Sequence, residues 1–127
     1  LEKALRSIAQ NADTVYVVTG VAFNKLGESK TINTVKAKDD TKDCPIPNYF
    51  YKVALKVKRS GSSITAASAV GVWMENRVYD DKNYANCAVS VDQMEEWTGL
   101  DFFVNLPKAL QTEAEKNSSW TTFKNFK

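Results

Sequence analysis

The chain has 127 residues, of which 43% are hydrophobic and 25% are charged, the size and composition of one soluble globular domain. Its formal net charge of +2 is too small to indicate a nucleic-acid partner by itself, so any basic surface would have to be local. No apolar run approaches the length that spans a bilayer, and the chain contains no histidine. These features exclude a membrane-spanning helix and any catalytic or zinc site that takes its histidine from these residues.

A short helix is predicted at the start of the chain. Leu1, Leu5 and Ile8 fall at positions i, i+4 and i+7 and form one apolar stripe, which the polar segment 11–13 ends. No residue precedes Leu1 to cap this helix, so the helix is already under way where the sequence opens. We therefore expect that sequence is missing upstream.

The next apolar segment, residues 15–18, is apolar on both alternating faces, which predicts a central strand rather than an exposed edge. Residues 24–44 are polar and predict an excursion that holds no more than an edge strand. Pro45 and Pro47 then set a rigid, extended entry into the next strand.

A β-hairpin is predicted over residues 52–74. Val53, Leu55 and Val57 point to one face of its first strand, and Lys52, Lys56 and Lys58 point to the other. Residues 59–63 form the turn, and residues 64–74 form the returning strand. Small residues in that strand leave room for a helix to pack closely: Ala66, Ala67, Ala69 and Gly71.

Two helices are predicted near the end of the chain. Ser90 followed by Gln93 is a capping box, and Gly99 stops the helix that it opens. Pro107 lies in the first turn of a last helix that runs to about residue 116, and the aromatic tail that follows needs a surface to cover. The elements together predict one α+β domain, or part of one, without repeats or linkers.

Cys44 and Cys87 are the only cysteines. An isolated pair in an otherwise cysteine-free chain fits one structural disulfide and a secreted or periplasmic location, and we predict that bridge. The alternative is two unpaired buried thiols that behave as small hydrophobic side chains.

Three segments, in this order, resemble the DNA/RNA non-specific endonuclease family of ββα-metal nucleases. They are the strand and Thr-Gly turn of residues 15–23, the proline, aromatic and lysine segment 46–53, and the late helix with its Asp-Phe-Phe stretch within residues 84–107. The resemblance spans residue 1 to about residue 115. It implies an α+β fold with a central antiparallel sheet flanked by helices. It also implies hydrolysis of DNA and RNA with one divalent ion per site, Mg²⁺ or else Mn²⁺ or Ca²⁺.

The catalytic signature of that family is an Asp-Arg-Gly-His motif that supplies the general base, then a metal-binding Asn, then a helix with Leu-Glu and an Arg four residues after the Glu. Leu1, Glu2 and Arg6 match the last element, and the first two are absent. We therefore expect residues 1–127 to be the C-terminal portion of a single endonuclease domain. Alone it should be inactive, and its partner should be an N-terminal segment or a second chain that carries the His and the Asn.

For Glu2 and Arg6, four residues apart on one helix face, two interpretations stay open. The resemblance implies that Glu2 holds the hydrated metal through water and that Arg6 offers its guanidinium to the phosphate as charge develops. The alternative is a solvated ion pair between the two side chains, which contributes a few tenths of a kcal/mol.

Two interpretations also stay open for the lysine face, which consists of Lys52, Lys56 and Lys58. It could follow a phosphate backbone, or it could be the solvated side of a sheet. The tryptophans and the aromatic segment 49–51 could stack on bases, but their spacing favours a core. A second function is a non-catalytic exported domain that uses the same scaffold for binding. The Asp-Arg-Gly-His motif upstream would decide for the enzyme.

Overall fold

The computed structural model describes residues 1–36, 38, 41–77, 79, 84–116 and 119–126. In chain order its elements are α1 (Glu2–Ala9), β1 (Thr14–Ala22), β2 (Thr34–Lys36), β3 (Asp43–Pro45), β4 (Tyr49–Ser60), β5 (Ser63–Glu75), the 3-10 helix η1 (Tyr84–Cys87), β6 (Ala88–Val89), α2 (Val91–Thr98), α3 (Lys108–Lys116) and α4 (Trp120–Asn125). None of the helices described has the length and apolar character that crossing a bilayer requires.

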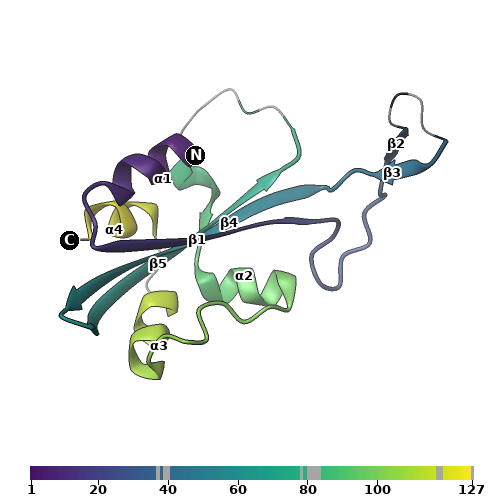
Figure 1. Cartoon of the computed structure of the whole chain (residues 1–127). Helices are drawn as coiled ribbons and strands as arrows, with labels where there is room; N and C mark the ends of the chain where they lie inside the picture. Colours follow the sequence, from purple (N-terminus) through teal and green to yellow (C-terminus); the bar gives the residue numbers. More distant parts are fainter. Residues whose placement is uncertain (37, 39–40, 78, 80–83, 117–118, 127) are drawn as a thin grey trace.

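The main sheet has four antiparallel strands in the order β1-β4-β5-β6. Strands β2 and β3 form a separate two-stranded sheet, which projects from one end of the main sheet (Figure 1). The molecule is thus α+β with an antiparallel sheet and helices, as the sequence predicted.

The predicted hairpin is the centre of the sheet. Strands β4 and β5 turn at Gly61, which has a φ of 62°, and pair along their whole length. A Cβ atom on Gly71 would lie 2.8 Å from Met94 Cε of α2, so the glycine allows the helix to approach the strand. The small residues of β5 therefore serve the packing that their sequence predicted.

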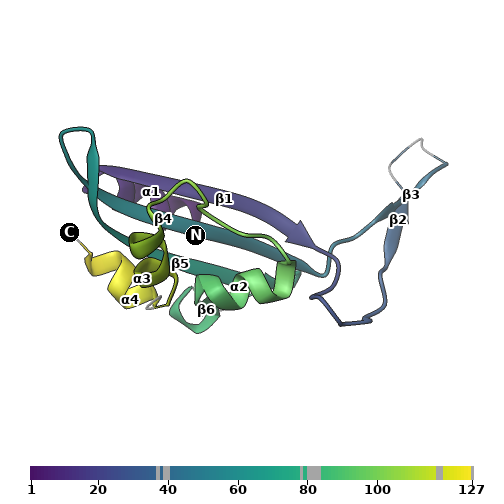
Figure 2. The same cartoon turned by 90° about the horizontal axis from the view of Figure 1, so that it is seen from below.

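Each face of the sheet is covered by two helices (Figures 1 and 2). Helices α2 and α3 cover the face of Val53, Leu55 and Val57, where the larger core lies. Helices α1 and α4 cover the other face and share a small core of four buried residues: Leu5, Ala54, Val70 and Phe123. The tail thus covers a sheet face, which meets the expectation from its aromatic residues.

The predicted caps of α2 are present. Ser90 Oγ accepts a hydrogen bond from Gln93 N at 3.1 Å, and Gly99 has a left-handed φ of 74° at the C-cap. Helix α3 begins at Lys108, directly after Pro107, and ends at Lys116 as predicted, but it is not the last helix, because α4 follows it.

The prediction that residues 15–18 form a central strand is wrong. In the described part of the chain, β1 pairs only with β4 and is an edge of the sheet. The strand is apolar on both faces, and yet Tyr16, Val17 and Val18 are about two-fifths exposed: 44%, 42% and 38%. Apolar side chains on both faces indicate that both faces of a strand are covered. They do not indicate whether its backbone is hydrogen-bonded to a strand on each side.

The segment 24–44 departs from its prediction in a smaller way, because it contributes two short strands to a sheet of their own. Cys44 lies exposed in β3, on that projecting sheet, whereas Cys87 is half-buried in η1 beside the main sheet. Among the described residues no disulfide joins them. The Cys44–Cys87 bridge therefore stays a prediction that this structure does not contain, with one cysteine in β3 and the other in η1.

Candidate functional site

Helix α1 presents a polar side to solvent and an apolar side to the sheet. Leu5 is buried against the sheet, and Leu1 and Ile8 pack beside it. Because residues four apart share a helix face, Glu2 and Arg6 lie together on the outer side. The sequence pattern of α1 thus fixes which way both candidate catalytic side chains point.

The partner of Glu2 is a lysine of the sheet. Lys52 Nζ lies 3.4 Å from Glu2 Oε1 and donates a hydrogen bond of 2.8 Å to Thr19 Oγ1 of β1. No ion pair between Glu2 and Arg6 occurs among the described residues. The alternative interpretation, an ion pair between Glu2 and Arg6, is therefore not present in the structure.

A cleft of about 220 Å³ lies between α1 and the edge strand. Its lining comes from three elements: Glu2, Leu5, Arg6 and Ala9 of α1, Val15 and Val17 of β1, and Lys52 of β4. The cleft brings a carboxylate, a guanidinium and an ammonium together beside the free edge of β1. Sequence reasoning found Glu2 and Arg6 but did not foresee that Lys52, which hydrogen-bonds Thr19, pairs with the Glu2 carboxylate, because these contacts depend on strand register.

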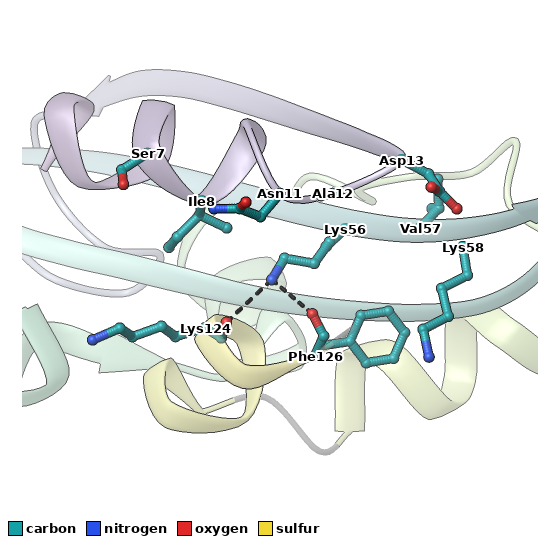
Figure 3. A pocket seen from close by; sticks show the side chains of 10 residues that line it. All are labelled: Ser7, Ile8, Asn11, Ala12, Asp13, Lys56, Val57, Lys58, Lys124 and Phe126. Carbon is teal, nitrogen blue, oxygen red and sulfur yellow. Dashed lines mark hydrogen bonds between the residues drawn. The ribbon is translucent and has the colours of Figure 1, made fainter.

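The lysine face does not have a single environment. Lys52 is half-buried beside Glu2, and Lys58 is exposed with its Nζ 5.0 Å from the centre of the Phe126 ring. Lys56 is only 5% exposed, and its ammonium donates hydrogen bonds to backbone carbonyls at the end of α4 (Figure 3). This corrects the prediction that Lys56 contacts nucleic acid, because its donors are already engaged and covered.

The aromatic residues confirm the core interpretation in most positions. Tyr49, Tyr51 and Trp73 are buried in the larger core, and Trp97 packs against it. Phe50 points to the other side of β4 and stays 43% exposed. A base-stacking surface is thus not formed by the buried aromatic residues.

A group of acidic side chains that the sequence did not reveal lies on the α2 and α3 face, away from α1. Carboxylate oxygens of Asp92, Glu95 and Glu115 lie within 4.8 Å of one another. Burial, a hydrogen bond with Asp101 and neighbouring negative charges raise the pKa of Glu95 to about 7, and burial raises the pKa of Glu115. Only the spacing of Asp92 and Glu95 on one helix was readable beforehand, since Glu115 comes from a different helix.

The chemistry around Glu2 fits part of a magnesium site. Mg²⁺ is usually bound through one or two carboxylates and keeps several of its waters. The side chain of Glu2 is 75% exposed and is the only carboxylate among the described residues that line the cleft. Glu2 could therefore hold one side of a hydrated ion, and the remaining protein ligand would have to come from elsewhere.

The fold is thus α+β, an antiparallel sheet between two pairs of helices, with Glu2 and Arg6 on a helix beside a sheet edge. The sequence model of the DNA/RNA non-specific endonuclease family matches residues 1–109. The chain belongs to this family of metal-dependent nucleases. A comparison with curated proteins gave no match.

Proposed function

We propose that residues 1–127 form the C-terminal portion of an endonuclease domain that hydrolyses phosphodiester bonds of both DNA and RNA. The observation that carries the proposal is the matched Glu2 and Arg6 pair, which lines the cleft beside the open strand β1. Such an enzyme would damage the cell's own nucleic acids, which supports a secreted or periplasmic location.

In this proposal Arg6 is the group that meets the phosphate. A guanidinium stays charged at all working pH values and presents a planar pair of donors to two phosphate oxygens. Its donors would meet the extra negative charge that develops as water attacks phosphorus. No hydrogen bond or ion pair of the Arg6 side chain is found among the described residues, which supports its availability to a substrate.

Glu2 has the role of orienting hydrated Mg²⁺, or Mn²⁺ or Ca²⁺ in its place, through water. When bound, such an ion would supply charge stabilisation at the leaving oxygen. Lys52, which donates a hydrogen bond to Thr19, pairs with the Glu2 carboxylate, so Lys52 is a positioning residue here rather than a nucleic-acid contact. Lys58 alone of the lysine face keeps an exposed side chain that could follow a phosphate backbone.

The general base and the second metal ligand would come from a partner segment, located upstream in the same protein or in a second chain. The chain has no histidine, so its own residues cannot supply an imidazole base. Strand β1 offers the place: its sequence TVYVVTGVA has no charged residue and no proline, the devices by which proteins usually protect an exposed edge. We propose that a strand of the partner pairs with β1.

The two faces of β1 fit alternating side chains of such a strand. On the α3 face, an apolar groove of about 520 Å³ lies between β1 and the segment 103–106. On the α1 face lies the cleft of Glu2 and Arg6. Because successive residues of a strand point to opposite faces, apolar residues would fill the groove while their neighbours reach the cleft.

The experiment that tests this function is substitution of Arg6 in the complete, active nuclease. Arg6→Ala should lower kcat on the order of 100-fold with little change in KM, because the lost contact forms as charge develops. Arg6→Lys should recover only part of the rate, since a point charge cannot replace the paired donors. A normal kcat in Arg6→Ala would contradict the role proposed for Arg6, whereas a complete domain without any nuclease activity would favour the non-catalytic binding domain.

A further inference from the structure

Helix α4 lies outside the family match, which ends at residue 109, and both of its ends are capped by side chains. It has six residues, too few to be stable alone in water. Ser119 caps its first turn by accepting a hydrogen bond from Thr122 N at 3.1 Å. Its last carbonyl groups need donors from elsewhere, as those of every helix do.

Lys56 supplies those donors from the middle of β4. Its Nζ lies 2.8 Å from the carbonyl oxygen of Phe123, 3.3 Å from that of Lys124 and 2.9 Å from that of Phe126. Figure 3 shows the ammonium pointing at this end of α4. The burial that accompanies these contacts lowers the pKa of Lys56. A positive charge at the negative end of the helix dipole fixes α4 to the sheet.

Helix α4 in turn covers the anchor of α1. Phe123 is fully buried in the same small core as Leu5, and Trp120 packs against that core from α4. Leu5 is the buried residue of α1, whose eight residues have no side-chain N-cap. Beyond this core, a cavity of about 610 Å³ separates the C-terminal part of α1 from residues 124 and 126 (Figure 3). The orientation of α1 thus depends on a few apolar contacts, to which α4 contributes two aromatic rings.

From this arrangement we infer that α4, held by Lys56, positions helix α1 and with it Glu2 and Arg6. Lys56 and Phe123 are positioning residues that touch neither substrate nor metal. The inference about α1 itself stands on the contacts above, whereas its effect on catalysis rests on the function proposed for Glu2 and Arg6. Small displacements of positioned groups can lower a rate by about 100-fold.

The test compares Lys56→Met with Lys124→Met. The first removes the ammonium from the carbonyl groups and keeps the length of the side chain, and the second makes the same change at an exposed position on α4. Hydrogen exchange of the backbone amides of residues 5–10 should accelerate at least about tenfold in Lys56→Met, because several buried acceptors lose their charged donor. It should stay at the wild-type rate in Lys124→Met.

Faster exchange in α4 with unchanged exchange in α1 would overturn the inference. If Lys56→Met does not fold, Phe123→Leu serves for the same comparison, because it removes part of the small core that Phe123 shares with Leu5 and leaves the lysine contacts in place. Retained α1 protection in a folded Phe123→Leu protein would also overturn it.

Kinetics in the complete nuclease separate this inference from the proposed function. Lys56→Met should lower kcat and leave KM near its wild-type value, while Lys124→Met should leave both unchanged. Faster hydrogen exchange in α1 of Lys56→Met with a normal kcat would contradict the catalytic roles of Glu2 and Arg6. It would still support the inference that α4 positions α1. If α1 keeps its wild-type hydrogen exchange in Lys56→Met and Arg6→Ala still loses much of its kcat, the positioning of α1 by α4 is contradicted. The function proposed for Arg6 would then still stand.

Discussion

Lysines on one face of one strand have different roles in this molecule. Lys52 orients a carboxylate, Lys56 caps a helix from inside the core, and Lys58 remains in solvent. Their alternation with Val53, Leu55 and Val57 was readable from the sequence and is confirmed. Their environments were not readable, because they depend on contacts with helices whose residues lie 50 to 70 positions away in the sequence.

The acidic group between α2 and α3 contains a carboxyl group, that of Glu95, which titrates in the neutral range. Phe102 N donates a hydrogen bond of 3.0 Å to Glu95 Oε2, which favours the charged form. Burial and the carboxylates of Asp101 and Glu115 oppose it more strongly and raise the pKa of Glu95 to about 7. At neutral pH Glu95 is therefore partly protonated in the folded protein, whereas it is ionised in the unfolded chain.

A pH-dependent stability follows. The folded protein binds this proton more tightly than the unfolded chain, in which the pKa of Glu95 is near 4.5. The stabilisation is complete below about pH 4.5 and is lost as the pH rises through about 7. Glu95→Gln should make the protein more stable than wild type at pH 8, by on the order of 2 kcal/mol, and the difference should shrink toward pH 4.5.

Urea unfolding between pH 4.5 and pH 8 measures this effect. Glu96→Gln is the control, because Glu96 is exposed on the same helix and hydrogen-bonds Gln93 Nε2 at 3.2 Å. Parallel stability curves for wild type and Glu95→Gln would contradict the account of this carboxylate.

At the scale of elements, local signals predicted most of the fold. The strand alternation and the Gly61 turn predicted the hairpin, and Ser90 and Gly99 predicted both ends of α2. The position of β1 was missed because apolar residues on both faces do not reveal an unpaired backbone edge. The same limit applies to the site: α1 was predicted with the correct face, but its contacts with Lys52 and α4 follow from tertiary packing.

The open edge of β1 should cause self-association of residues 1–127 when no partner segment is present. Val18→Lys places a charge on this edge and should shift the protein toward the monomer, since edge lysines oppose strand pairing between molecules. Val35→Lys is the matched control, because Val35 is 55% exposed but belongs to the separate sheet of β2 and β3.

Sedimentation velocity over a range of concentrations distinguishes the variants. We expect concentration-dependent association in wild type and in Val35→Lys, and a reduced tendency in Val18→Lys. Association that is equal in all three proteins would show that β1 is not the contact surface.

At the scale of the whole molecule, the proposed function needs catalytic groups and a partner strand from outside residues 1–127. Both sheet faces are covered by helices, whereas the strand beside Glu2 and Arg6 is unpaired on its outer side in the described residues. The family match is consistent with nucleic acid as substrate. In the proposed function, catalysis depends on an imidazole that these 127 residues do not contain.

Reconstitution of nuclease activity tests this central claim most directly. Purified residues 1–127 are incubated with plasmid DNA and Mg²⁺, alone and together with a segment that carries the Asp-Arg-Gly-His motif and the following Asn. Arg6→Ala and Val18→Lys are assayed in parallel. We predict no cleavage by the chain alone, cleavage by the mixture, and a large loss of rate with either substitution. Cleavage by residues 1–127 alone above the buffer control would contradict the claim that the general base lies outside this chain.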